Sequence, residues 1–301
     1  MTGVAVITLA HGRHDHLRAQ LAGLRRGMSP DHYVVAAMDD GDIARVVAEG
    51  GHPAARVTVV DVPGSGSELP LAAARNLAAA TAIAAGADVL IFLDVDCIPG
   101  ADLVETYAAA CRTTMSAAAV PRPTKIDVPE VFSGPVHYLD PPSSESGYTE
   151  EELRKSQPHP ARPVVADADR EAADDLRLFW SLSFAVTARS WTQVGGFDEG
   201  YSGYGGEDTD YAMLLARAGG RLWWLRDAAA YHQHHDVESP PVRHLEAIVR
   251  NSNRFHRRWG LFPMEGWLAA FEAEGLITQA GSPPRWALSA TGRRRPGSGA
   301  R

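Results

Sequence analysis

The first hundred residues alternate between short apolar segments that suit buried strands and segments whose apolar residues recur at helical spacing. Strands are expected over residues 4–9, 33–38, 56–60 and 88–93. Helical patterns are expected over residues 16–26, 43–48 and 71–85. Strands that alternate with helices in this way form a parallel sheet with helices on both faces. The expected fold class is therefore α/β, with a Rossmann-like mixed, mainly parallel sheet flanked by helices.

Acidic residues follow two of these strands at the point where each ends. The segment LIFLDVDCI places Asp94 and Asp96 directly after a buried run, and residues 33–38 run into Asp39. Ligands of such sheets bind beyond the carboxyl ends of the strands. Residues i and i+2 of an extended chain share a face, so both carboxylates of the DxD motif can point at one ligand. A turn exposed to solvent is the alternative, and the buried run in front of the motif weighs against it.

The glycine-rich motifs that bind phosphates in many nucleotide-binding proteins are absent. No GxGxxG follows the first strand, and the sequence contains no GxxxxGK[ST]. A bound phosphate group would need another source of positive charge. Mn²⁺ or Mg²⁺ held by carboxylates is the natural candidate, because these ions accept oxygen ligands together with phosphate oxygens.

The second half of the chain contributes two further polar clusters. Residues 195–211 read GGFDEGYSGYGGEDTDY, and this glycine density suggests a backbone that approaches a ligand closely. A helix is expected to begin near Asp208, and capping of that helix is the alternative role for Glu207 and Asp208. Three histidines then fall within four residues, His232, His234 and His235, a pattern that favours a ligand role over a structural one.

Six short motifs occur in one order along residues 4 to about 260. They are Asp39-Asp40-Gly41, Ala74-Arg75-Asn76, Leu93-Asp94-Val95-Asp96, Gly195-Gly196-Phe197-Asp198-Glu199, Gly205-Gly206-Glu207-Asp208 and Tyr231-His232-Gln233. Each motif alone is weak, but the ordered set resembles inverting glycosyltransferases of the GT-A fold. The first half is similar to family-2 enzymes and the second to the C-terminal domain of galactosyltransferases. The resemblance implies a metal-dependent hexosyltransferase that moves a sugar from a nucleotide-diphosphate sugar, expected to be a UDP-sugar, to an acceptor hydroxyl.

The resemblance also implies roles for individual residues. Asp208 would be the catalytic base, and Glu207 would hold the acceptor together with Tyr204. Asp96, His232 and the close competitor His234 would bind the metal ion. The donor and its nucleotide would be contacted by His11, Arg13, Asp39, Arg75, Asp94, Val95, Gly195 and Gly196.

Composition limits the partners and the setting of the chain. A formal net charge of −8 argues against a nucleic-acid partner. The two cysteines give no disulfide framework, and no apolar stretch reaches the length of about 20 residues that a membrane span needs. The N-terminal segment lacks the basic region of a signal peptide. The expected setting is therefore the cytoplasm. The expected acceptor is a carbohydrate, a glycolipid or a small molecule, and the sequence leaves a homodimer open.

The domain division follows the motifs. Residues 1–98 are expected to form the nucleotide-sugar-binding half, and residues 99–275 the acceptor-binding and catalytic half of the same domain. The proline-rich stretch 121–178 is either a surface insertion or an acceptor-binding lid, and residues 276–301 are expected to be a disordered tail. Two other functions remain open. One is a metal-dependent nucleotidyltransferase or nucleotide-sugar hydrolase, and the other is a non-catalytic protein that binds nucleotide sugars.

Overall fold

The structure is a computed structural model that describes residues 2–51, 53–64, 68–118, 128–144, 147–236 and 238–294. Its main sheet has eight strands in the order β3-β2-β1-β4-β10-β6-β11-β9. The first four in the chain are parallel: β1 (Gly3–Ala10), β2 (His32–Met38), β3 (Arg56–Val62) and β4 (Ala87–Leu93). The remaining four are β6 (Glu130–Ser133), β9 (Arg170–Ala172), β10 (Ser183–Thr187) and β11 (Arg221–Leu225). Antiparallel pairing of β10 with β4 makes the sheet mixed, so the predicted fold class is confirmed.

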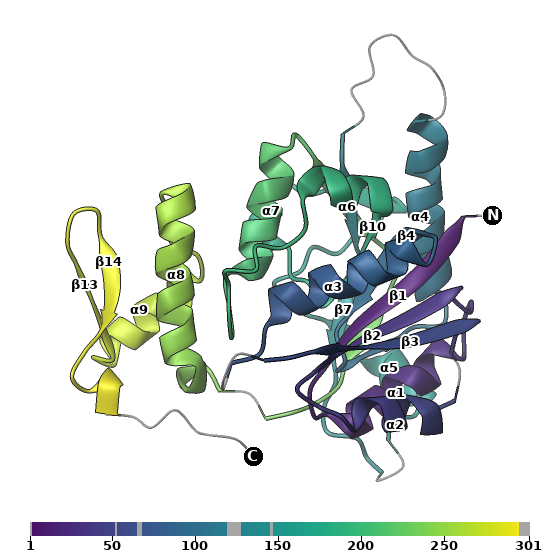
Figure 1. The fold of residues 1–301 in the computed structure, drawn as a ribbon, viewed down its shortest axis with the longest axis horizontal. Helices are drawn as coiled ribbons and strands as arrows, with labels where there is room; N and C mark the ends of the chain where they lie inside the picture. The colour runs from purple at the N-terminus through teal and green to yellow at the C-terminus, as the bar shows by residue number, and fades with distance from the viewer. Residues whose placement is uncertain are drawn as a thin grey trace.

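Helices cover both faces of this sheet, because alternate residues of each strand point to opposite sides. Val4 and Val6 pack with helix α1 (His14–Leu24) and helix α2 (Ile43–Glu49), whereas Ala5 and Ile7 pack with helix α3 (Leu71–Ala84). In Figure 1, α1 and α2 lie below the strands and α3 crosses above them. Helix α4 (Leu103–Ala118) packs on the same face of the sheet as α1 and α2. Helices α6 (Ala188–Val194) and α7 (Glu207–Arg217) pack on the face that α3 covers.

A smaller sheet lies beyond the end of β4. Its order is β5-β12-β7-β8, formed by β5 (Cys97–Pro99), β12 (Ala230–His232), β7 (Val136–Tyr138) and β8 (Gln157–Pro158). In the antiparallel pair of β12 and β5, His232 lies opposite Cys97. This register brings the histidine segment next to the DxD motif, although more than 130 residues of chain separate them.

Residues 128–178 are more regular than the sequence indicates. Strand β6 lies inside the main sheet between β10 and β11, and β9 forms its edge. The segment also contains β7, β8, helix α5 (Glu150–Lys155) and the short helix η1 (Leu176–Leu178). The prediction of a surface insertion is therefore wrong for residues 130–133, and residues 121–127 lie outside the described part. Strands of two to four residues among prolines are too short to show a periodic pattern.

The C-terminal part forms a separate small layer at the left of Figure 1. It consists of η2 (Val242–His244), α8 (Leu245–Trp259), α9 (Glu265–Ala273), the hairpin β13 (Ile277–Ala280) and β14 (Arg285–Leu288), and η3 (Gly292–Arg294). The predicted disordered tail is thus wrong for residues 277–294, because Ile277 is buried and Leu288 packs against the same apolar cluster. Residues 295–301 lie outside the described part. Across the described residues, no helix is long and apolar enough to cross a membrane.

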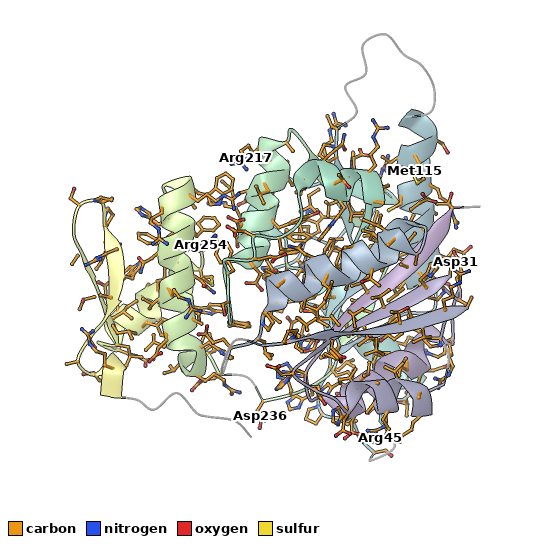
Figure 2. The ribbon with its side chains drawn as sticks, viewed as in Figure 1. Asp31, Arg45, Met115, Arg217, Asp236 and Arg254 are labelled. Carbon is orange, nitrogen blue, oxygen red and sulfur yellow. The ribbon has the colours of Figure 1, made fainter. Side chains whose placement is uncertain are left out.

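Ion pairs attach this layer to the rest of the chain. Arg254 on α8, labelled in Figure 2, lies 2.7 Å from Asp198 (Nη2 to Oδ1). Arg258 forms ion pairs with Asp198 and with the fully buried Asp210 of α7. Asp198, the first of the two acidic residues of the GGFDE motif, therefore attaches α8 to the rest of the chain.

Candidate functional site

A cavity of about 650 Å³ opens beyond the carboxyl end of β4 and beside the first turn of α7. Its polar lining includes Arg75, Asp94, Glu207 and Asp208. Both halves of the chain therefore contribute to one cavity, as the order of the motifs predicts. Its aromatic lining consists of Tyr138, His159, Trp180, Tyr204 and Trp267.

The turn that carries the DxD motif is held by a buried glutamine that the sequence analysis missed. Gln20 on α1 donates from Nε2 to the backbone oxygens of Asp94 (2.7 Å) and Cys97 (3.1 Å). Its Oε1 accepts hydrogen bonds from Thr8 and Tyr33, so its orientation is fixed. A polar residue on the buried face of an amphipathic helix was the available signal. The turn is rigid because these buried polar groups are all paired.

Arg75 joins the two acidic motifs. Its guanidinium lies 3.3 Å from Asp94 (Nη2 to Oδ1) and 3.6 Å from Glu207 (Nη1 to Oε1), and its side chain is only 4% exposed. Burial raises the pKa of Asp94 to about 7, with Arg75 opposing the rise and Asp96 and Asp208 adding to it. Burial also raises the pKa of Glu207 to about 7, and the nearby charge of Asp208 adds to the effect. One buried arginine thus interacts with three carboxyl groups, those of Asp94, Glu207 and Asp208.

Asp208 does not cap its own helix. Gly206 is the N-cap residue of α7, with φ of 95°, and no side chain caps this end. Asp208 instead accepts a hydrogen bond at Oδ2 from the backbone N–H of Ser181, at 3.1 Å. Its Oδ1 is buried, and no hydrogen-bond donor within the described residues reaches it. A buried carboxylate oxygen without a partner is costly unless a ligand supplies one.

The glycines in front of α7, Gly205 and Gly206, have positive φ angles, which favour glycine at both positions. Gly205 has φ of 92°, and a Cβ at this position would lie 2.7 Å from Sδ of Met264. Only glycine fits such a position readily. The chain can therefore turn tightly here and bring Glu207 and Asp208 to the cavity wall.

A second cluster, next to the cavity, has the donor set of a metal site. Asp96, His232 and His235 each offer one ligand atom within 4.8 Å of the others. Oδ2 of Asp96 lies 3.5 Å from Nε2 of His232 and 3.7 Å from Nε2 of His235. Burial lowers the pKa of His232, which favours the neutral imidazole that a metal ion requires. Two imidazoles and one carboxylate suit Mn²⁺ better than Mg²⁺, which prefers oxygen ligands.

His234, the predicted alternative ligand, lies outside this cluster. Its side chain is exposed, and its backbone N–H donates to the Tyr148 hydroxyl at 2.9 Å. The chain leaves β12 after His232 and turns, and this turn directs His235 rather than His234 toward Asp96. Irregular backbone has no fixed side-chain period, so the sequence could not decide between neighbouring histidines.

Three of the residues predicted to contact the donor, His11, Arg13 and Asp39, lie at the ends of β1 and β2 and outside the cavity lining. Arg13 reaches Oδ2 of Asp96 at 2.7 Å, and Nδ1 of His11 lies 2.6 Å from the backbone oxygen of Met38. Asp39 is exposed and accepts from the N–H of Gly64 at 2.8 Å. Asp40, which was not among the predicted contacts, accepts a hydrogen bond from the backbone N–H of Gly12. This bond connects the segments that follow β1 and β2. These placements are compatible with the predicted contacts.

Three other residues predicted to contact the donor, Gly195, Gly196 and Val95, have positions that turns or core packing explain. Gly196 has φ of 74°, and a Cβ there would lie 2.7 Å from Oδ1 of Asn76. Gly195 ends α6, and neither glycine lines the cavity. The Val95 side chain packs in the apolar core beneath the sheet end. The structure thus shows packing and turn roles for these residues rather than a place in the cavity lining.

Tyr204 is the residue that the resemblance assigns, besides Glu207, to the acceptor. Tyr204 lines the cavity with 40% of its surface exposed and stacks on His244 and Trp267, at centroid distances of 4.7 and 5.8 Å. An exposed aromatic face in a cavity is a common platform for a sugar-like ring. Of the other aromatic lining residues, Tyr138 ends the short strand β7, Trp267 belongs to helix α9, and His159 and Trp180 lie in irregular segments.

The raised pKa of Glu207 predicts a pH-dependent stability difference. Its ordinary value is 4.5 and its folded value about 7, so folding favours the protonated form. The stabilising contribution is complete below about pH 4.5 and is lost as the pH rises through about 7. We expect Glu207→Gln to raise the Tm relative to wild type more at about pH 8 than at about pH 5, in thermal unfolding followed by circular dichroism. Glu105→Gln, which changes an exposed carboxyl on α4, is the matched control. A Tm difference for Glu207→Gln that does not change with pH would contradict the prediction.

Comparisons with known proteins agree with this geometry. The family model described as the N-terminal domain of galactosyltransferase matches residues 170–238, which include α7 and the histidine segment. A validoxylamine A glucosyltransferase of Streptomyces hygroscopicus subsp. limoneus is 27% identical over 85% of this chain and 56% of its own length. A validoxylamine A glucosyltransferase of Streptomyces hygroscopicus subsp. jinggangensis is also 27% identical, over 85% of this chain and 60% of its own length. The chain thus spans less than two thirds of these relatives.

Solved structures share the fold at low sequence identity. GalNAc-T7 with UDP, GalNAc and Mn²⁺ superposes with a TM-score of 0.55 at 15% identity, covering 85% of this chain and 50% of that one. S. aureus TarS 1–349 with UDP-GlcNAc superposes with a TM-score of 0.52 at 13% identity, covering 85% of this chain and 73% of that one. These findings confirm the GT-A fold and the resemblance to glycosyltransferases, with a galactosyltransferase-type segment in the second half.

Proposed function

We propose that this chain of GT-A fold is a metal-dependent, inverting glycosyltransferase that moves a sugar from a UDP-sugar to an acceptor hydroxyl. One observation carries the proposal. Oδ1 of Asp208 is buried and has no donor within the described residues, and it belongs to a cavity that Arg75 and Asp94 also line. A group held in this way is suited to accept a proton from a bound hydroxyl.

The roles of the chain's own residues follow from their positions. Asp96, His232 and His235 would hold Mn²⁺, which when bound balances the negative charge of the diphosphate leaving group. Arg13 and Arg75 bring positive charge to the same end of the site. Tyr204 and Trp267 would support the acceptor ring.

Asp208 would take the proton from the acceptor hydroxyl at Oδ1 while that oxygen attacks the anomeric carbon. Its Oδ2 stays bonded to Ser181, so the carboxylate keeps its orientation during transfer. A single base acting on the face opposite the leaving group gives one displacement and inverts the anomeric centre. Glu207 beside it would bind a second hydroxyl of the acceptor.

Product analysis tests the proposal. UDP-, GDP- and dTDP-sugars would be incubated with the protein, Mn²⁺ and a set of acceptors. The products would be identified by mass spectrometry. Because two relatives are named validoxylamine A glucosyltransferases, UDP-glucose and validoxylamine A are the first pair to test. A glycosylated acceptor with an inverted anomeric centre is expected. Free sugar or sugar phosphate as the main product would instead indicate a hydrolase or nucleotidyltransferase.

The metal site gives a prediction that separates two neighbouring histidines. We expect His235→Ala to weaken Mn²⁺ binding by at least about 10-fold, because it removes one of three ligand atoms. His234→Ala, the matched control, changes an exposed side chain and should leave the affinity unchanged. Isothermal calorimetry of Mn²⁺ with each variant measures both. Loss of binding in His234→Ala alone would show that the predicted ligand His234 is the correct one.

A further inference from the structure

Arg162 is a buried cation that no part of the proposed function uses. Its side chain is 4% exposed, and none of the carboxylates in the described part of the chain forms an ion pair with it. It lies between the rings of Trp180 and Trp224, with its Cζ 4.7 and 5.2 Å from their centroids. Burial lowers the pKa of Arg162 to about 10, so the guanidinium remains charged at neutral pH. An unpaired buried charge is costly, and its retention calls for a role.

The hydrogen bonds of Arg162 lead to the proposed catalytic base. Nη1 donates to Oγ of Ser133 at 3.3 Å, and Nη2 donates to the backbone oxygen of Trp180 at 3.2 Å. That oxygen belongs to the peptide unit whose N–H is the N–H of Ser181. The same N–H donates to Oδ2 of Asp208 at 3.1 Å. One peptide unit therefore connects the guanidinium to the carboxylate.

We propose that Arg162 is a positioning residue for Asp208 and acts through the Trp180–Ser181 peptide. The inference rests on the proposed role of Asp208 as the base. Donation to the carbonyl oxygen polarises the peptide and strengthens its N–H as a donor, by an estimated 10–30% per bond in a chain of hydrogen bonds. The guanidinium also fixes the plane of the peptide. Oδ2 is thereby held in place, and Oδ1 is left for the acceptor.

This role gives a function to part of the proline-rich stretch. Arg162 lies in it, and Ser133 and the rings of Trp180 and Trp224 hold the guanidinium in one orientation. Trp180 and Ser181 line the cavity themselves, so a shift of this peptide would also change the acceptor wall. A buried arginine with a rigid planar head is suited to such orientation, since less entropy is lost per hydrogen bond than with lysine.

Other charged groups act on Asp208 as well, and the test must separate them from Arg162. The charges of Arg75, Asp94 and Glu207 interact with that of Asp208, and the hydroxyl of Tyr204 is also under its influence. In the part of the chain that the structure describes, none of these four residues forms a hydrogen bond with the Trp180–Ser181 peptide. An effect of Arg162 that runs through the peptide is therefore visible at the Ser181 amide itself.

The first experiment is kinetic and uses the full chain with Mn²⁺ and donor. Arg162→Met keeps the length of the side chain between the two tryptophans but removes the charge and both hydrogen bonds. We expect kcat to fall about 10- to 100-fold with the donor KM unchanged, and the acidic limb of the pH profile of kcat to move to higher pH. Arg162→Lys should recover part of the loss. Arg170→Met removes an arginine that stacks on Phe132 and Trp223. Within the described residues Arg170 forms no hydrogen bond with this peptide, so its loss should leave kcat unchanged.

The second experiment does not depend on turnover. The amide resonance of Ser181 is observed by NMR in protein with ¹⁵N-labelled serine. We expect the proton resonance to move upfield in Arg162→Met and to stay in place in Arg170→Met. An unchanged Ser181 resonance in Arg162→Met overturns the proposal. So does a fall in kcat that comes with a loss of UDP binding and an unchanged pH profile, which would show a general structural role. If wild-type protein transfers no sugar, the proposed function fails, and the NMR experiment still decides whether Arg162 and Asp208 communicate.

Discussion

Asp208→Asn is expected to lower kcat for sugar transfer by about 10² to 10⁴-fold, the usual contribution of a general base. Asparagine has the same shape, and its side-chain oxygen can still accept the hydrogen bond from Ser181. It cannot take a proton from the acceptor. Steady-state kinetics with a UDP-sugar and acceptor would measure the loss, and calorimetry with UDP and Mn²⁺ would measure binding.

Donor binding should survive in this variant, because Asp208 is not a member of the cluster of Asp96, His232 and His235 that would hold the metal ion. Asp102→Asn, which changes an exposed carboxyl at the start of α4, is the control for the change of charge. If Asp208→Asn lost UDP binding to the same extent as transfer, Asp208 would belong to the donor site and would not be the base. If it kept full activity, the proposed mechanism would be wrong.

Asp96→Ala is expected to abolish metal-dependent nucleotide binding. Both histidines and Arg13 approach the same oxygen of Asp96, so its removal takes away the centre of the cluster. We expect the Mn²⁺ affinity to fall by more than about 100-fold, beyond the effect of losing an outer-shell partner. Calorimetric titration of UDP in the presence of Mn²⁺ or of EDTA would show the change.

The wild-type protein in EDTA should match Asp96→Ala in Mn²⁺, because both lack the bound metal ion. Asp15→Ala provides the control, since Asp15 is 96% exposed and, within the described residues, pairs with Arg18 on its own helix and with no other cation. Tight UDP binding by Asp96→Ala would show that the nucleotide is held without the metal cluster. In that case the arginines, and not the metal ion, would neutralise the diphosphate.

Local sequence patterns were sufficient for the first half of the fold. The alternation of strands and helices predicted strands β1 to β4, and each predicted boundary lies within two residues of the observed one. Buried parallel strands and an alanine-rich helix have strong local patterns, which is why this prediction succeeded. The same patterns located Asp94 and Asp96 at the end of β4, and the glycines located Glu207 and Asp208. These predictions depend on neighbours along the chain, which the sequence contains directly.

The remaining features depend on contacts between distant segments. The strands of residues 130–172 are defined by their partners β10, β11 and β12, and the C-terminal hairpin by the apolar cluster on α8 and α9. None has a long enough periodic pattern to be predicted alone. Gln20 likewise has its role only because α1 lies against the turn after β4.

The sequence by itself therefore determined the α/β class, the acidic strand end and the acidic pair behind the glycines. Tertiary structure alone decided that His235 rather than His234 joins Asp96, and that Arg162 reaches the peptide bonded to Asp208. The physical reason is the same in both cases. Where the backbone is irregular, the direction of a side chain is set by the packing of segments that lie far apart in the sequence, and no local period records it.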